Sequence, residues 1–226
     1  MVHGSVILRP DLIIFDCDGV LIDSEGIAST LIAAELTALG WEMTEAESHD
    51  IFLGMSIIDM QPVIENHLGR RLPEGWRAEL AEKLILMLST QSRLIPGARE
   101  MLEGVNARGI DWRVASNSSD EEMAVKFART GLAALTEGRT HAAASVVAKG
   151  GRPKPAPDVY LAAAASANTA PGRCIVLEDS PLGVTAAVAA GMICYGFAPH
   201  GDGAHLLAAG ATAILRDLNA LFGVLA

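Results

Sequence analysis

Aromatic residues and cysteines are scarce in this sequence. Phe, Trp and Tyr make up 4% of the 226 residues, so the core must be built from Ala, Leu, Ile, Val and Met. The three cysteines, Cys17, Cys174 and Cys194, are too few and too scattered for a disulfide framework, and none belongs to a Cys-x-x-Cys pair. They are typical of small buried side chains in a reducing compartment, and we expect a cytoplasmic protein.

Long apolar runs and an excess of positive charge are also lacking. No uninterrupted apolar stretch reaches the roughly 18–20 residues that cross a bilayer. The N-terminal residues 1–4 lack the charged start, apolar stretch and cleavage site of a secretory signal. With 17 basic against 27 acidic side chains, the formal net charge is −10. A basic face for nucleic acid or an anionic membrane is therefore not expected, and we expect neither partner. We take a monomer as the expected state.

Half of the residues are apolar, and many fall in short runs separated by helical patterns. The runs are 12–15, 112–115, 174–177, 192–195 and 213–215. Near-continuous apolarity over about four residues is typical of a strand that is covered on both faces, as in a parallel sheet. A capping box at 119–122 opens one intervening helix, and Ser180-Pro181 opens another. The pattern predicts a doubly wound α/β core of the Rossmann-like kind.

The stretch 24–94 carries helical patterns and no strand-like run. Ile27, Leu31 and Ala34 share one helix face before Gly40, and Thr44 with Glu47 forms another capping box. An all-helical block that follows the first strand indicates an inserted domain. We expect a helical cap domain at 24–94 and a Rossmann-like core made of 1–23 and 95–226.

Polar side chains follow three of the predicted strands. They are Asp16 and Asp18 after the first, Ser116 and Asn117 after the second, and Glu178 and Asp179 after the third. In an open parallel sheet, ligands bind beyond the carboxyl ends of the strands. Four carboxylates in one crevice would raise each other's pKa unless a cation lies among them. A hard divalent ion with oxygen ligands, Mg²⁺ first, is the natural partner.

Simpler interpretations of these residues are available. Asp16-x-Asp18 does not open a calcium loop, because Val20 and Leu21 stand where such a loop needs Asp or Asn and then Gly. Asp179 alone fits a helix cap equally well. The proline-rich loop 149–158, which holds two of the four lysines, Lys149 and Lys154, fits either a solvated surface loop or a rigid holder for a lysine.

The Asp-x-Asp pair also fits phosphoryl transfer. One carboxylate can attack phosphorus to give an aspartyl-phosphate, while the other protonates the leaving oxygen and then activates water. Mg²⁺ and a lysine would neutralise the remaining phosphoryl oxygens, where most of the catalysis of such reactions lies.

Four segments together resemble the motifs of the haloacid dehalogenase-like hydrolase superfamily, in its β-phosphoglucomutase-like branch with a small helical cap. They are Asp16-Cys17-Asp18-Gly19-Val20-Leu21-Ile22-Asp23-Ser24-Glu25, Ser116, Lys154-Pro155-Ala156-Pro157-Asp158 and Glu178-Asp179-Ser180. The resemblance implies a set of roles. Asp16 is the nucleophile and a Mg²⁺ ligand, Asp18 is the general acid/base and binds the metal through its carbonyl, and Asp179 with Glu178 completes the metal site. Ser116 and the Asn117 amide hold the phosphoryl group, and Lys154 balances its charge.

Within this superfamily, Asp18 favours cleavage of a phosphate ester, because an alkoxide leaving group needs a proton and a halide does not. By resemblance, mutases of this branch carry a cap histidine and a cap arginine where this chain has Ala28 and Ile57. We therefore expect a phosphatase, with a phosphosugar mutase as the alternative. A non-catalytic metabolite-binding protein is a third hypothesis, but it predicts loss of an acidic motif residue, and none is lost.

The resemblance implies a small phosphorylated sugar, polyol or sugar acid as substrate, with Gly54, Met55 and Ser56 of the cap facing it. Four cap cations, Arg70, Arg71, Arg77 and Lys83, could reach an anionic substrate or simply lie on solvated helix faces.

Overall fold

The structure is a computed structural model that describes residues 9–53 and 55–225. A six-stranded parallel sheet forms the centre of this part of the chain. The N-terminal residues 1–4 and the predicted cap residue Gly54 lie outside these ranges. The strands of this sheet are β1 (Leu12–Phe15), β4 (Asp111–Ser116), β5 (Thr140–Ala142), β6 (Cys174–Glu178), β7 (Ile193–Phe197) and β8 (Ala213–Leu215). Their order in space is β5-β4-β1-β6-β7-β8.

The first strand lies between β4 and β6, with Leu12 opposite both Asp111 and Cys174. All four of its residues are fully buried. Ile13 and Phe15 pack in the core on one face of the sheet, and Leu12 and Ile14 pack in the core on the other. This is why the run lacks polar alternation, since a strand covered on both faces has no solvated side. The predicted doubly wound α/β fold is confirmed.

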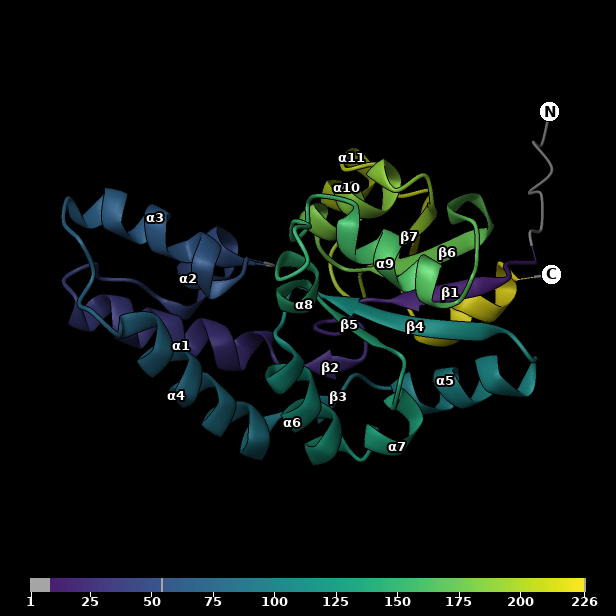
Figure 1. The fold of residues 1–226 in the computed structure, drawn as a ribbon, viewed down its shortest axis with the longest axis horizontal. Coiled ribbons are helices and arrows are strands. Elements are labelled where there is room, and N and C mark those ends of the chain that lie inside the picture. Colours follow the sequence, from purple (N-terminus) through teal and green to yellow (C-terminus); the bar gives the residue numbers. More distant parts are fainter. Residues whose placement is uncertain (1–8, 54, 226) are drawn as a thin grey trace.

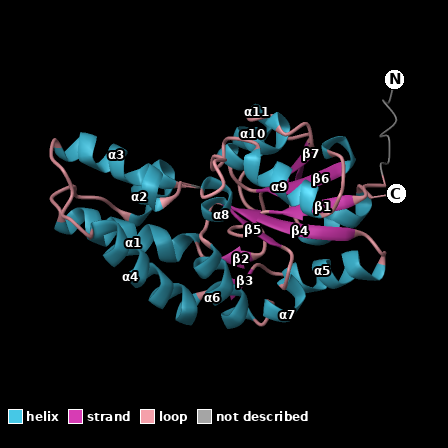
Figure 2. Ribbon diagram, viewed as in Figure 1, coloured by secondary structure: helices cyan, strands magenta, loops and turns pink. Residues whose placement is uncertain are grey.

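Helices cover both faces of this sheet (Figure 2). They are α5 (Ala98–Ala107), α6 (Asp120–Thr130), α7 (Ala133–Thr136), α8 (Ala143–Val147), α9 (Asp158–Ser166), α10 (Pro181–Ala189) and α11 (Ala204–Ala208), with short 3₁₀ turns η1 (Pro171–Arg173) and η2 (Leu218–Gly223). The capping box predicted at 119–122 opens α6: the Ser119 hydroxyl accepts from the Glu122 amide, and the Glu122 side chain accepts from the Ser119 amide. Ser180 caps α10, with Pro181 as its first residue.

Four helices stand apart from the sheet and extend to one side of it (Figure 1). They are α1 (Glu25–Ala38), α2 (Glu45–Phe52), α3 (Ile57–Leu68) and α4 (Trp76–Gln91). These helices share a core of their own, built around Leu36, Phe52, Ile64 and Leu80. The Thr44–Glu47 capping box opens α2 as predicted.

A two-stranded antiparallel ribbon joins this helical block to the sheet. Strand β2 (Ile22–Asp23) leads into α1 and strand β3 (Arg93–Leu94) leads out of α4, with Ile22 opposite Leu94 and Asp23 opposite Arg93. These two strands could not be predicted, because two residues are too few to show a period. Strand β5 was also missed, since Thr140 and His141 interrupt its apolar pattern.

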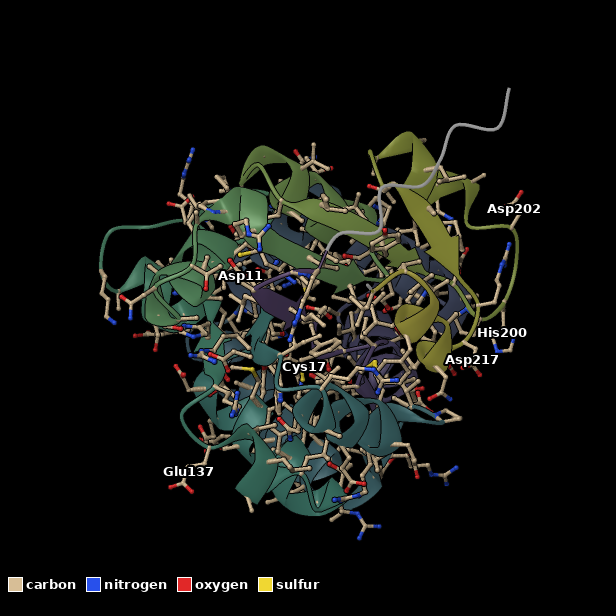
Figure 3. The ribbon with its side chains drawn as sticks, turned by 90° about the vertical axis from the view of Figure 1, so that its right-hand side faces the viewer. Asp11, Cys17, Glu137, His200, Asp202 and Asp217 are labelled. Atoms are coloured by element: carbon tan, nitrogen blue, oxygen red, sulfur yellow. The ribbon has the colours of Figure 1, made fainter. Side chains whose placement is uncertain are left out.

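The three cysteines are buried and free, as the sequence predicted. Cys17 lies inside the core, whereas His200, Asp202 and Asp217 lie at the periphery of the face shown in Figure 3. Burial raises the pKa of the Cys17 thiol well above its usual value, which keeps it unreactive. Within residues 9–53 and 55–225, no helix combines the length and apolar character that spanning a membrane requires.

Candidate active site

The carboxyl ends of β1, β4 and β6 meet at one cleft between the sheet and the helical block. Asp16 follows the last residue of β1, while Ser116 and Glu178 are the last residues of β4 and β6. Because β1 pairs with both neighbours, these three chain ends lie side by side. The cleft has a volume of about 970 Å³, and it is lined by all four predicted carboxylates together with Ser116, Asn117 and Lys154.

Lys154 is the centre of the buried charge in this cleft. Its side chain is 3% exposed, and its Nζ lies 2.6 Å from Asp16 Oδ1 and 2.6 Å from Glu178 Oε1. Burial alone would lower the pKa of Lys154, but the Asp16 and Glu178 carboxylates outweigh it and raise that pKa above its usual value. The loop 149–158 therefore holds its second lysine inside the site.

Two neighbours fix Lys154 in place. The Asn117 side chain accepts from the Lys154 amide at 2.9 Å and donates to the Lys154 carbonyl at 3.3 Å. The Tyr160 ring lies under the ammonium, with 4.7 Å between Nζ and the ring centroid, and the Tyr160 hydroxyl donates to Glu178 Oε1 at 2.9 Å. Asn117 thus acts on the site through the lysine loop, a role that its place in the sequence did not show.

Asp16, Glu178 and Asp179 form a cluster with ligand oxygens that all lie within 4.8 Å of one another. Burial raises the pKa of Asp16 to about 8, and the Glu178 and Asp18 carboxylates add to the rise although Lys154 opposes it. Three converging carboxylates are the donors that a hard divalent cation takes, and such a cation would remove the repulsion among them. The donor chemistry of the cluster therefore fits Mg²⁺.

Two glycines allow the chain to come this close to the carboxylates. A Cβ at Gly19, whose φ is +74°, would collide with the Asp179 carboxylate, and a Cβ at Gly183 would collide with that of Glu178. The second Glu178 oxygen accepts from the Ser180 amide at 2.9 Å and from its hydroxyl at 3.0 Å. Ser180, as the cap of α10, thus also orients a carboxylate of the cluster.

The Asp18 carboxylate lies apart from this cluster and is bound by Lys126. Lys126 Nζ lies 2.6 Å from Oδ1 and 2.8 Å from Oδ2 of Asp18, and it also donates to Ser118 Oγ at 2.8 Å. Ser24 and Ser118 donate to Asp18 as well. Burial alone would raise the pKa of Asp18, but Lys126 and these hydroxyls hold it below its usual value. These contacts fix the orientation of the Asp18 carboxyl group.

Lys126 was not predicted to belong to the site, although its position on the apolar face of a helix could have indicated a buried partner. Lys126 lies between Met123 and Phe127 on the buried side of α6, and its side chain is 1% exposed. A lysine on the apolar side of an amphipathic helix needs a buried partner, because an unpaired charge there is costly. The partner, Asp18, is 108 residues away along the chain, and only the fold brings them together.

Ser116 and the cap residues lie on opposite sides of the cleft. Ser116 is buried, and its hydroxyl accepts from the Ser118 amide at 3.0 Å and lies 3.4 Å from Asp18 Oδ2. Met55 and Ser56 line the cleft from the helical block. Ser56 caps α3 and donates to Asp59 at 2.6 Å.

The four cap cations differ in position. Arg77 lines the cleft. Arg71 pairs with Glu65 at 3.0 Å, Lys83 pairs with Glu35 at 2.6 Å, and Arg70 donates to the Leu39 carbonyl at 2.8 Å. These three lie outside the lining of the cleft, so of the four only Arg77 is placed to meet a ligand there.

Comparison with known proteins identifies relatives over most of the chain. The family model described as haloacid dehalogenase-like hydrolase matches residues 10–191. A probable pseudouridine-5′-phosphatase from Drosophila melanogaster is 31% identical over 187 residues, which cover 79% of this chain and 78% of that one. A phosphorylated carbohydrates phosphatase from Thermotoga maritima is 29% identical over 95% of this chain and 100% of its own length.

A solved structure has the same architecture. The conserved haloacid dehalogenase-like protein ATU0790 from Agrobacterium tumefaciens superposes with a TM-score of 0.79 at 30% identity, over 95% of this chain and 96% of that one.

Proposed function

The chain belongs to the haloacid dehalogenase-like hydrolase family, and on that premise we propose that it is a Mg²⁺-dependent phosphatase of a small phosphorylated sugar, polyol or sugar acid. Its relatives named as phosphatases of pseudouridine phosphate and of phosphorylated carbohydrates support this substrate class. The observation that carries the proposal is the pairing of Lys154 with Asp16 beside Glu178 and Asp179.

Asp16 is the nucleophile of the proposed reaction. An Asp16 oxygen attacks phosphorus, the bond from phosphorus to the ester oxygen breaks, and the leaving alkoxide takes a proton from Asp18. Because Lys126 and two hydroxyls hold the pKa of Asp18 low in the free protein, Asp18 must take up this proton as the ester binds. In the second step Asp18 takes a proton from water, the water oxygen attacks the aspartyl-phosphate, and inorganic phosphate leaves while Asp16 is regenerated. Ser116 and Lys154 bind the phosphoryl oxygens, and the charge of Lys154 stabilises them as charge moves to the leaving group.

Asp16, Glu178 and Asp179 would hold Mg²⁺ through their carboxylates, and Asp18 through its backbone carbonyl. When bound, the metal supplies positive charge next to the transferring phosphoryl group. The orientation of Asp18 supports this division of roles, because its carboxylate is already occupied by Lys126 and two hydroxyls.

The helical block 24–94 is proposed to be a cap that covers the substrate and excludes water. Its residues Met55 and Ser56 line the cleft opposite Ser116. Gly54, which lies outside the described residues, is proposed to face the substrate with them. Ala28 and Ile57 line the same cleft, and neither can supply the imidazole or guanidinium expected of a mutase. Hydrolysis is therefore favoured over phosphoryl return to a sugar.

Removing the metal should stop the reaction. We expect the purified protein to release p-nitrophenol from p-nitrophenyl phosphate in Mg²⁺, and EDTA to lower that rate at least about a hundredfold, because a metal Lewis acid contributes several kcal/mol to such a transition state. Excess Mg²⁺ added after EDTA should restore the rate, which controls for damage by the chelator. Equal rates with and without EDTA would contradict the metal assignment.

A parallel assay tests the mutase alternative. β-Glucose 1-phosphate is supplied together with the 1,6-bisphosphate, and glucose 6-phosphate and free phosphate are both measured. We expect phosphate release only. Turnover to glucose 6-phosphate would overturn the interpretation of Ala28 and Ile57, and no reaction with any ester would favour the non-catalytic hypothesis.

Lys126→Met should lower kcat for alkyl phosphates about a hundredfold while leaving KM within a few-fold. Lys126 holds both Asp18 oxygens, and misplacing a catalytic group by about 1 Å costs on the order of a hundredfold in rate. Lys126→Arg retains the charge and should recover part of the loss. If Lys126→Met keeps at least half of the wild-type kcat, the lysine does not position Asp18.

A further inference from the structure

The cap side of the cleft carries apolar side chains that remain open to solvent. Ala28 of α1, Met55, Ile57 and Ile58 at the start of α3, and Leu84 of α4 line the cleft and are all at least partly exposed. Val147 of α8, also exposed, lines it from the sheet side. We call these six residues the apolar wall. Ile58 is 63% exposed, which is far from the burial expected of an isoleucine that serves only to hold the cap together.

The polar groups that accompany the apolar wall are few, and two of the serines are buried. Ser56 and Asp59 bond to each other at 2.6 Å. Ser29 and Ser48 are buried, at 7% and 1% exposure. Among the described cap residues that line the cleft, Arg77 and His49 are the only basic ones. The cap side therefore offers few hydrogen-bonding groups beside several apolar side chains, of which Ala28, Met55, Ile57 and Leu84 also pack against the core of the helical block.

The cleft is large enough to hold an organic group beside the phosphoryl group. At about 970 Å³ it lies at the upper end of the roughly 300–1,000 Å³ typical of sites that enclose drug-sized ligands. Its charged end is the cluster around Lys154, which a phosphoryl group fills. A phosphorylated compound with only hydroxyl groups beyond the ester would leave the apolar wall in contact with water.

We infer that the substrate is a phosphate monoester whose organic group carries an alkyl or aryl portion, which packs on the apolar wall while the phosphoryl group lies at Lys154. This inference rests on the proposed phosphatase function and favours, among its substrates, esters that carry an apolar portion over esters that carry hydroxyl groups alone. The apolar wall is continuous with the catalytic residues in one cleft, so the occupant that reaches both is the substrate itself. Exposed apolar surface next to polar groups is typical of a binding site.

A series of primary alkyl phosphates tests the inference. Ethyl, butyl and hexyl phosphate share the same kind of leaving group and differ only in apolar length. Each methylene buried on the apolar wall is worth about 0.8 kcal/mol, or about fourfold. We expect kcat/KM to rise at least about fiftyfold from ethyl to hexyl phosphate, and 3-phenylpropyl phosphate tests whether an aryl group is accepted equally.

Sorbitol 6-phosphate and p-nitrophenyl phosphate distinguish failure of the inference from failure of the proposed phosphatase function. If sorbitol 6-phosphate exceeds hexyl phosphate in kcat/KM, or the alkyl series is flat, the inference is wrong and the phosphatase function stands. If no ester in the set, p-nitrophenyl phosphate included, releases phosphate, the proposed function itself is wrong.

A pair of variants tests whether the apolar wall is responsible. Ile58→Ser should lower the ratio of hexyl to ethyl kcat/KM about tenfold, because the hexyl chain loses contact with an isoleucine. Leu86→Ser is the matched control, since Leu86 is 68% exposed on α4 and does not line the cleft, and it should leave the ratio unchanged. If Ile58→Ser lowers kcat/KM for both esters by the same factor, Ile58 serves closure of the cap on the core, and the inference is overturned.

Discussion

Asp16→Asn is expected to lower the rate of phosphate release at least about a thousandfold. An amide is a poor nucleophile, and losing the nucleophile of a catalytic unit typically costs on the order of 10³–10⁶ in kcat. The substitution keeps the shape of the side chain and an oxygen that can accept from Lys154, so the buried contact at 2.6 Å is not lost outright. The fold should therefore survive.

The covalent intermediate gives a direct readout of the same prediction. Hydroxylamine attacks the acyl carbon of an aspartyl-phosphate and leaves a hydroxamate on the nucleophile. Peptide mass spectrometry should locate that hydroxamate at Asp16 in the wild-type protein during turnover and find none in Asp16→Asn.

Asp11→Asn is the matched control for this variant. Asp11 stands at the opposite end of β1 and pairs with Arg173 on the surface, where both side chains are about half exposed. An exposed pair of this kind contributes only about 0–1 kcal/mol to stability, and activity should be unchanged. Wild-type rates in Asp16→Asn, with the fold intact by circular dichroism, would mean that another group attacks phosphorus.

Lys154→Met is expected to lower both stability and activity. Lys154 is the cation between two buried carboxylates, Asp16 and Glu178. Removing one partner of a buried pair costs about 3–5 kcal/mol, because the remaining charges are left without compensation. The loss of one positive contact to the phosphoryl group should lower kcat about 10²–10³-fold.

The effect of Mg²⁺ on the melting temperature shows whether Lys154→Met destabilises the protein through lost charge or through lost packing. Without Lys154 the cluster is more negative, so Mg²⁺ should raise the melting temperature of Lys154→Met by more than it raises that of the wild type. Differential scanning fluorimetry in EDTA and in Mg²⁺ measures both changes. Lys83→Met is the control, since Lys83 forms an exposed pair with Glu35 in the cap and should change stability by less than about 1 kcal/mol. Equal Mg²⁺ shifts in wild type and Lys154→Met would show that Lys154 and the metal do not act on the same carboxylates.

The elements that the sequence predicted best are those whose environment is uniform. The run at 12–15 coincides with β1, because a strand enclosed by helices carries an unbroken apolar pattern. The run at 213–215 coincides with β8, although this edge strand is only partly buried. Strand β5 could not be predicted in this way, since it is short and carries Thr140 and His141. Its pairing with Val114 and Ala115 of β4 decides its conformation, and that contact is not local in the sequence.

The site likewise contains residues that the local sequence predicts and residues that only non-local contacts bring together. Asp16, Ser116 and Glu178 could be placed together from the rule that parallel strands end at one edge. The Asp18–Lys126 pair could not, because nothing in the local sequence states which carboxylate a buried lysine meets. The exposure of Ile58 was equally hidden, since its apolar side chain looks like an ordinary core position until the fold leaves it open to the cleft.

The ribbon of β2 and β3 has an evolutionary consequence. Because Ile22 lies opposite Leu94, the chain leaves the sheet domain and returns to it at neighbouring points. An insertion whose ends are adjacent costs little closure entropy, almost independently of its length. The helical block can therefore be lengthened, exchanged or diversified by descent without disturbing the strand ends that carry Asp16 and Glu178. Substitutions in the helical block can change the substrate, while the strand ends of the sheet keep the same catalytic residues.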